Sequence, residues 1–102
     1  MKRLMVRYKV KPECAAENEG YIARVFEQLE REKPNGVRYA SFKLDDDVSF
    51  VHIVSYEVAD GRNLLTGLSA FKTFAAGVKE RCEEPPIVVE LNEIGSYGLF
   101  GK

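Results

Sequence analysis

The 102-residue chain has no tryptophan, a single histidine and two cysteines, and each scarcity excludes a class of site. Cys14 and Cys82 stand far apart, and with one histidine they form neither a CxxC redox motif nor a zinc ligand set. We therefore expect two free thiols and no metal site. A glycine-rich dinucleotide-binding motif is also lacking, so no cofactor is expected.

A charge imbalance and a long apolar run are missing as well. The 15 Lys and Arg residues nearly balance the 16 Asp and Glu residues, which gives a formal net charge of -1. This balance argues against the broad cationic surface that nonspecific nucleic-acid binding requires. No apolar run approaches the roughly 18 residues that indicate a membrane span. We expect a cytoplasmic protein that binds neither nucleic acid nor membrane.

Two hydrophobic periods alternate along the chain in the order strand, helix, strand, strand, helix, strand. A period of two predicts four strands, at Arg3–Val10, Val37–Leu44, Val48–Glu57 and Ile87–Ile94. A period of 3.6 predicts a long helix from Glu13 to about Lys33, and a second helix that has Ser69 as its N-cap and an apolar stripe ending at Cys82. That stripe makes Cys82 the more buried cysteine. Residues 1–102 are thus expected to form a single α+β domain, a ferredoxin-like βαββαβ fold with a four-stranded antiparallel sheet.

Two short segments are expected to interrupt these elements. Asp45–Asp47 lacks the ligand spacing of an EF-hand, so it is interpreted as a solvated hairpin turn. Glu83–Pro86 is expected to end the second helix before the last strand begins.

Strand alternation divides the sheet residues into two sets. We expect the helices to cover a mostly apolar set: Leu4, Val6, Tyr8, Ala40, Phe42, Leu44, Val51, Ile53, Val89 and Leu91. The opposite face would then carry Met5, Arg7, Lys9, Tyr39, Ser41, Phe50, His52, Val54, Tyr56, Val88, Glu90 and Asn92. Because Phe50, Val54 and Tyr56 are too apolar to leave in water, we expect a second sheet to cover them in a homodimer.

Four segments carry a resemblance to a known family: Gly36–Asp45, Ser49–Glu57, Ala70–Phe74 and Glu93–Tyr97. Together they resemble the antibiotic biosynthesis monooxygenase-like (ABM) domains of the dimeric α+β barrel superfamily. The resemblance implies two ferredoxin-like sheets packed face to face as a homodimer, with a pocket between each sheet and its helices. It also implies an activity of the kind found in that family, which includes cofactor-independent oxygenases of aromatic polyketides or quinols and haem-degrading enzymes.

Position by position, the resemblance argues against haem degradation. That branch uses an asparagine, a tryptophan and a histidine where this chain has Val6, Leu64 or Leu65, and Ala75. The polyketide oxygenases of the family use a polar set of residues around the substrate. In this chain only tyrosines and His52 could take the place of that set. The resemblance therefore implies a monooxygenase-like protein acting on a small aromatic or quinol-type substrate. The alternative is a non-catalytic homodimer that binds a small molecule.

Three residues are candidates for the site. His52 can titrate near neutrality, so it is the natural proton acceptor for a phenolic substrate, although strand alternation places it on the sheet-to-sheet face, where it would be an interface histidine. Tyr8 and Tyr56 are candidate substrate-binding residues, with a core role as the alternative for Tyr8.

An RNA-recognition module shares the topology, and Phe50–Ile53 is similar to its third-strand motif. The preceding Asp46, Asp47 and Ser49 do not fit that motif, nor does Met5 on the first strand.

Overall fold

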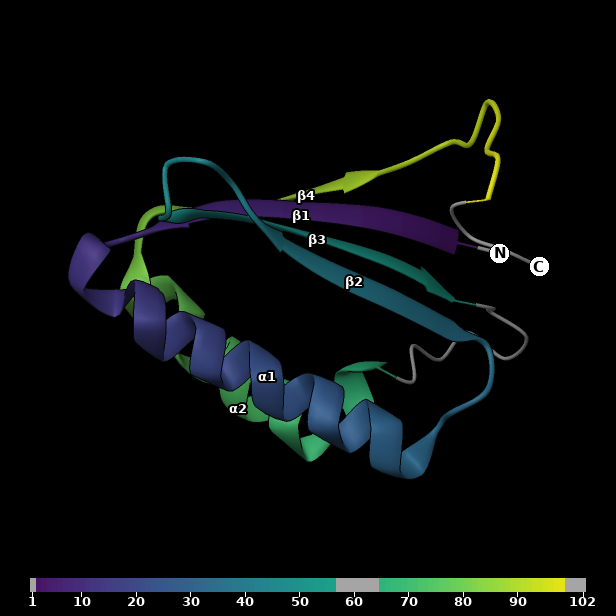
Figure 1. Cartoon of the computed structure of the whole chain (residues 1–102), viewed down its shortest axis with the longest axis horizontal. Helices are drawn as coiled ribbons and strands as arrows, with labels where there is room; N and C mark the ends of the chain where they lie inside the picture. The colour runs from purple at the N-terminus through teal and green to yellow at the C-terminus, as the bar shows by residue number, and fades with distance from the viewer. Residues whose placement is uncertain (1, 57–64, 99–102) are drawn as a thin grey trace.

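The computed structural model describes residues 2–56 and 65–98. In chain order its strands and α-helices are β1 (Lys2–Val10), α1 (Ala15–Glu32), β2 (Val37–Lys43), β3 (Ser49–Tyr56), α2 (Ser69–Arg81) and β4 (Cys82–Glu90). The strands form one antiparallel sheet in the order β2-β3-β1-β4, with both helices on one face (Figure 1). This confirms the predicted ferredoxin-like α+β fold.

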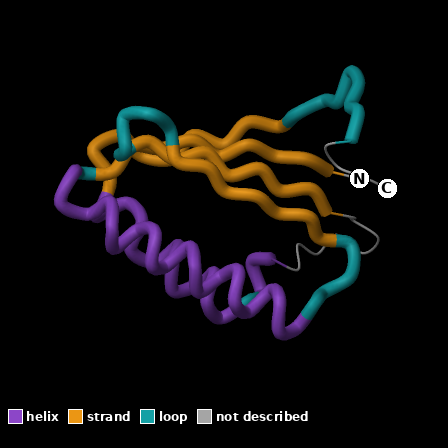
Figure 2. The backbone as a smooth tube through the Cα atoms, viewed as in Figure 1, coloured by secondary structure: helices purple, strands orange, loops and turns teal. Residues whose placement is uncertain are grey.

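The molecule has two layers, a twisted sheet and a pair of helices packed side by side beneath it (Figure 2). The helices cover one face of the sheet, and the other face is open. Within residues 2–56 and 65–98, neither helix combines the length and the hydropathy that crossing a membrane requires.

The ends of the two helices differ slightly from the prediction. Pro12–Cys14 forms a 3-10 turn before α1, and Lys33 ends that helix in the left-handed region with φ 46°, its N–H donating to the Leu29 carbonyl at 2.7 Å. A second 3-10 turn, Leu65–Gly67, precedes α2. Leu68, not Ser69, is the N-cap of α2; the Ser69 hydroxyl instead lies 3.4 Å from Oε1 of Gln28 on α1. The Ser69 hydroxyl therefore contacts Gln28 of α1 and makes no N-cap hydrogen bond within α2.

The last strand begins earlier than predicted, at Cys82, and ends at Glu90. Pro85 and Pro86 are tolerated because β4 is an edge strand and they lie where its register against β1 shifts. Cys82 therefore opens β4 and does not end the stripe of α2. Cys14 and Cys82 are both half-buried free thiols, so Cys82 does not stand out as the more buried of the two.

The aspartate segment forms the predicted hairpin turn between β2 and β3. The carboxylate of Asp46 accepts hydrogen bonds from the backbone N–H groups of Val48 and Ser49 at 3.0 and 2.8 Å, and from the Ser49 hydroxyl at 2.6 Å. These bonds, chiefly the one from the Ser49 hydroxyl, lower the pKa of Asp46 to about 2. Asp47 takes the left-handed conformation, with φ 67°, that closes the turn.

The prediction of which face of β3 the helices cover is wrong. In the β1–β3 ladder Val6 lies opposite His52 and Tyr8 lies opposite Phe50, and residues directly opposite each other share a face. The helices therefore cover Phe50, His52, Val54 and Tyr56, all of which are buried. Val51 and Ile53 lie on the open face. The alternation within β3 is bulky on both faces, so it does not indicate which face the helices cover.

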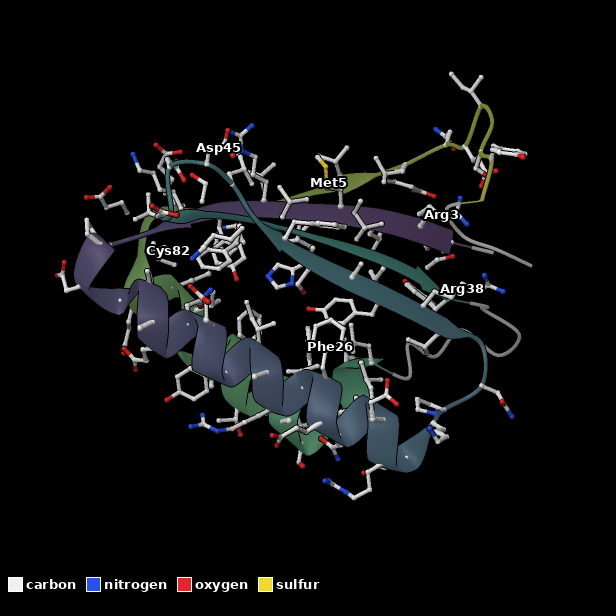
Figure 3. The ribbon with its side chains drawn as sticks, in the orientation of Figure 1. Arg3, Met5, Phe26, Arg38, Asp45 and Cys82 are labelled. Atoms are coloured by element: carbon white, nitrogen blue, oxygen red, sulfur yellow. The ribbon has the colours of Figure 1, made fainter. Side chains whose placement is uncertain are left out.

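The same inversion applies to β2 and β4. Tyr39 and Ser41 share the helix-covered face with His52, and Val88 shares it with Val6. The open face instead exposes Phe42 by 52%, Ile87 by 64% and Val89 by 41%. Figure 3 shows Met5 on the side of the sheet away from the helices, whereas Phe26 points from α1 toward the sheet. The apolar area left uncovered in this chain is thus a different one from the predicted Phe50 and Tyr56 surface.

Candidate functional site

A cavity of about 260 Å³ lies between the helix-covered face of the sheet and α2. Its walls come from β1, β2, β3, β4, the 3-10 turn at Leu65–Gly67 and α2. The residues that line it are Leu4, Val6, Tyr8, Tyr39, His52, Val54, Leu65, Thr66, Phe71, Phe74, Ala75, Val78, Pro86 and Val88. Apart from Thr66, the polar residues of this lining are two tyrosines and the histidine, and they turn little polar surface toward the cavity.

His52 is held on both of its ring nitrogens. Nε2 lies 2.7 Å from the Tyr8 hydroxyl, and Nδ1 lies 2.8 Å from the Tyr39 hydroxyl and 2.6 Å from the Ser41 hydroxyl. The imidazole also stacks between the Tyr8 and Tyr39 rings, with centroids 5.3 and 5.7 Å away. Three strands therefore fix one imidazole in position, and its side chain is only 3% exposed.

Burial makes this cluster neutral. Desolvation lowers the pKa of His52 from 6.5 to about 4, because the charged imidazolium is poorly solvated there. Desolvation likewise raises the pKa of Tyr39 to about 12 and that of Tyr8 further still, although the hydrogen bond from Asn18 lowers the pKa of Tyr8. At neutral pH the imidazole therefore has one protonated nitrogen and one nitrogen that accepts a hydrogen bond, and both phenols carry their protons.

The structure brings two of the three candidate residues together. Tyr8 and His52 are in direct contact at the cavity wall, so His52 faces the region between sheet and helices and not the open face. Tyr56 is buried at the end of β3, opposite Lys2 and Val37, and is not among the residues that line the cavity. The site thus contains the candidate acceptor and one of its tyrosines.

Sequence reasoning did not include four polar residues around this pair in the site: Asn18, Tyr39, Ser41 and Arg81. Tyr39 and Ser41 were recognisable in one respect, because strand alternation across the short hairpin places them beside His52. Asn18 and Arg81 are helix residues that the apolar periodicity passes over, yet they are 0% and 4% exposed. A polar residue on the buried side of an amphipathic helix was the available signal.

Among the residues that the structure describes, no three His, Cys, Asp or Glu side chains come close enough together to hold a metal ion.

The chain matches no protein-family model and no curated protein sequence. Its structure is similar to solved structures. A candidate antibiotic biosynthesis monooxygenase from Nitrosomonas europaea superposes with a TM-score of 0.77 at 21% identity, over 93% of this chain and 100% of that one. Rv0793 from Mycobacterium tuberculosis gives 0.72 at 17% identity, over 93% and 96%. SnoaB, a cofactor-independent oxygenase from Streptomyces nogalater whose variant was solved, gives 0.69 at 19% identity, over 95% and 96%. The chain therefore has the fold of the ABM domains.

Proposed function

We propose that this protein is a cofactor-independent monooxygenase that acts on a small aromatic or quinol-type substrate. The observation that carries the proposal is the Tyr8–His52 pair at the wall of an apolar cavity, because it joins a neutral proton acceptor to a site of suitable chemistry. The shared fold with SnoaB supports the same class of reaction. Tyr8 and His52 are the proposed catalytic residues, and Tyr39 helps hold the imidazole.

The proposed first step is proton removal from a substrate hydroxyl. The substrate proton moves to the Tyr8 oxygen while the Tyr8 proton moves to Nε2 of His52, which leaves a substrate anion beside an imidazolium. The anion compensates the imidazolium charge that burial otherwise disfavours. The substrate itself then supplies the electrons that reduce O2: one oxygen atom enters the substrate, two hydrogens leave it, and the other oxygen atom departs as water.

The shape of the cavity matches this chemistry. Phe71, Phe74 and Val78 form an apolar wall from α2, which favours a flat aromatic ring and keeps water from the anion. Val6 and Ala75 also line the cavity and offer no ligand to iron, so we do not propose haem as the substrate.

The test is oxygen uptake with an anthrone and with a substituted hydroquinone, with no flavin, metal or haem added. Tyr8→Phe and His52→Gln should each lower kcat by roughly 10²-fold or more. Tyr97→Phe is the matched control, since Tyr97 is fully exposed on the chain after β4 and should leave kcat unchanged. Equal turnover in the wild type and in His52→Gln would refute the proposed role of His52.

A non-catalytic binding protein is the second candidate, and one observation favours it. Both nitrogens of His52 already have protein partners, so the cluster is complete without a substrate and the apolar walls alone can hold a ligand. Tight binding of an aromatic ligand, measured by calorimetry, with no oxygen uptake by the wild type would support this candidate over the oxygenase.

We also propose that the protein acts as a homodimer, with the open sheet face as its interface. Phe42 on β2 and Ile87 and Val89 on β4 expose large apolar side chains at the two edges of this face, which a partner could cover. Ile94, beyond β4, is fully exposed and adds to the apolar surface available to a partner. Sedimentation equilibrium at micromolar concentration should give twice the mass of 11.5 kDa.

A further inference from the structure

Arg81 is a buried cation whose partners are all neutral. It lies at the end of α2 and is 4% exposed; within residues 2–56 and 65–98 no carboxylate comes within ion-pair distance of it. Its Nε donates to Oδ1 of Asn18 at 3.0 Å, its Nη2 donates to the Phe74 carbonyl at 3.0 Å, and its guanidinium lies 4.5 Å from the centroid of the Tyr21 ring. A buried charge is costly, so this arrangement calls for an explanation.

The first consequence is that Arg81 orients Asn18. A guanidinium only donates hydrogen bonds, so the Asn18 atom that faces it must be the carbonyl oxygen. The amide nitrogen of Asn18 is thereby turned toward Tyr8, whose hydroxyl oxygen it reaches at 2.9 Å. Because Asn18 is completely buried, water does not compete for either end of its side chain.

The second consequence concerns the Tyr8 proton. The Tyr8 oxygen already accepts from Asn18, so its own hydrogen is free to be donated to Nε2 of His52, 2.7 Å away. Nε2 must then be the unprotonated nitrogen, and the single proton of the neutral imidazole resides on Nδ1, where the Ser41 and Tyr39 hydroxyls lie within hydrogen-bond distance. This assignment gives the Tyr8 hydroxyl hydrogen and the imidazole N–H each a partner.

We propose that Arg81 and Asn18 are positioning residues that hold His52 in the tautomer protonated at Nδ1, with Nε2 kept as an acceptor for the Tyr8 proton. The effect passes through two intermediaries, from Arg81 to the Asn18 amide and from that amide to the Tyr8 hydroxyl. Its value for catalysis rests on the proposed function, since the proton transfer described above requires an unprotonated Nε2. The tautomer itself does not depend on any substrate.

The chain contains a single histidine, so the tautomer can be measured directly. In a long-range ¹H–¹⁵N correlation spectrum of the uniformly ¹⁵N-labelled protein at neutral pH, Nε2 couples to both carbon-bound ring protons, whereas Nδ1 couples strongly to one of them. We expect the nitrogen with two strong couplings to have the chemical shift of an unprotonated imidazole nitrogen. The shift of a protonated nitrogen at that position would overturn the proposal.

Two variants test the source of the tautomer. In Asn18→Asp the carboxylate still accepts from Arg81 but cannot donate to Tyr8, so Tyr8 should donate to it and Nε2 of His52 should become protonated. In Arg81→Met the Asn18 amide is free to rotate, and the population protonated at Nε2 should rise. Arg24→Met is the matched control, because Arg24 is exposed and its guanidinium lies over the same Tyr21 ring at 5.1 Å; it should leave the tautomer unchanged.

Circular dichroism establishes that each variant is folded. Should Arg81→Met not fold, Asn18→Asp carries the test, because it keeps the size of the side chain and the contact with Arg81. A folded Asn18→Asp that stays protonated at Nδ1 would overturn the proposal. Oxygen uptake separates this inference from the proposed function: the expected tautomer change in a protein that never consumes oxygen would refute the oxygenase and leave the positioning roles intact.

Discussion

The Tyr8 hydroxyl is hydrogen-bonded to Nε2 of His52 across 2.7 Å while their rings stack 5.3 Å apart, although the two residues are 44 positions apart in the chain. β1 and β3 are neighbours in the middle of the sheet, so both side chains project from its two central strands and are buried. Position and proton direction are thus set by the scaffold before any ligand arrives, which is the preorganisation that a proton-transfer site needs.

Removal of the Tyr8 hydroxyl should cost more stability than removal of the Tyr39 hydroxyl. Tyr8→Phe leaves Nε2 of His52 and the amide of Asn18 buried without a partner, so we expect a loss of about 1–3 kcal/mol. Tyr39→Phe leaves the Ser41 hydroxyl at Nδ1 and should cost about 1 kcal/mol or less. Urea unfolding of both variants checks the order. Equal losses would contradict the hydrogen-bond series described above.

The free energy of unfolding should decrease as the pH is lowered, over a range set by the pKa of His52 in the folded and unfolded states. Its pKa is about 4 when folded and 6.5 when it is free, so between these values the unfolded state binds a proton that the folded state does not. Unfolding is therefore favoured as the pH falls, by roughly 2 kcal/mol between about pH 7 and about pH 4.5, and this loss levels off below the folded pKa. Urea unfolding of the wild type and of His52→Gln across this range makes the measurement. If the unfolding free energy of His52→Gln depended on pH as steeply as that of the wild type, other titrating groups would be the cause of the loss.

The open sheet face should control the oligomeric state. Phe42→Lys and Ile87→Lys place a charge among the exposed apolar side chains of β2 and β4, and we expect each to shift a dimer toward monomer without loss of secondary structure. Ala76→Lys on the exposed surface of α2 is the control and should remain dimeric. Sedimentation equilibrium reads the masses. Dimers that persist in both sheet variants would exclude this face as the interface.

Local sequence patterns were enough to predict the order of the elements and to place Ser41 and His52 on the same face of the sheet. The Asp45–Asp47 turn is short, so the pairing of Ser41 with His52 follows from counting outward from the turn. Aspartate is also typical of turns because its carboxylate accepts hydrogen bonds from nearby backbone N–H groups, as that of Asp46 does from Val48 and Ser49. Within this hairpin the residues that share a face were predicted correctly, although the two faces were assigned to the wrong sides of the sheet.

Local sequence patterns could not predict which face of the sheet the helices cover. It depends on the register of β1 against β3, a contact between distant segments, and β3 offers Phe50 and Val54 on one face and Val51 and Ile53 on the other. Either face is apolar enough to be buried, so alternation alone does not decide between them. The register that pairs Val6 with His52 decides it and brings the histidine into the cavity. Asn18 and Arg81 were missed because their roles depend on contacts between α1 and α2.

Gly77 lies beside the side chain of Arg81 in α2, and its substitution gives a final test. A Cβ atom added at Gly77 would lie 2.8 Å from Nη1 of Arg81, so the guanidinium would have to shift to make room for a side chain at this position. Alanine normally stabilises a helix interior by about 1 kcal/mol over glycine, and Gly20→Ala in α1, where nothing lies within 4 Å of the new atom, should show that gain. In Gly77→Ala the gain should be cancelled or reversed, because the displaced guanidinium loses its bonds to Asn18 and to the Phe74 carbonyl. Urea unfolding of the two variants compares them directly, and the His52 tautomer should change only in Gly77→Ala. An equal gain in both variants would show that Arg81 moves aside at no cost, and that its buried position is not required.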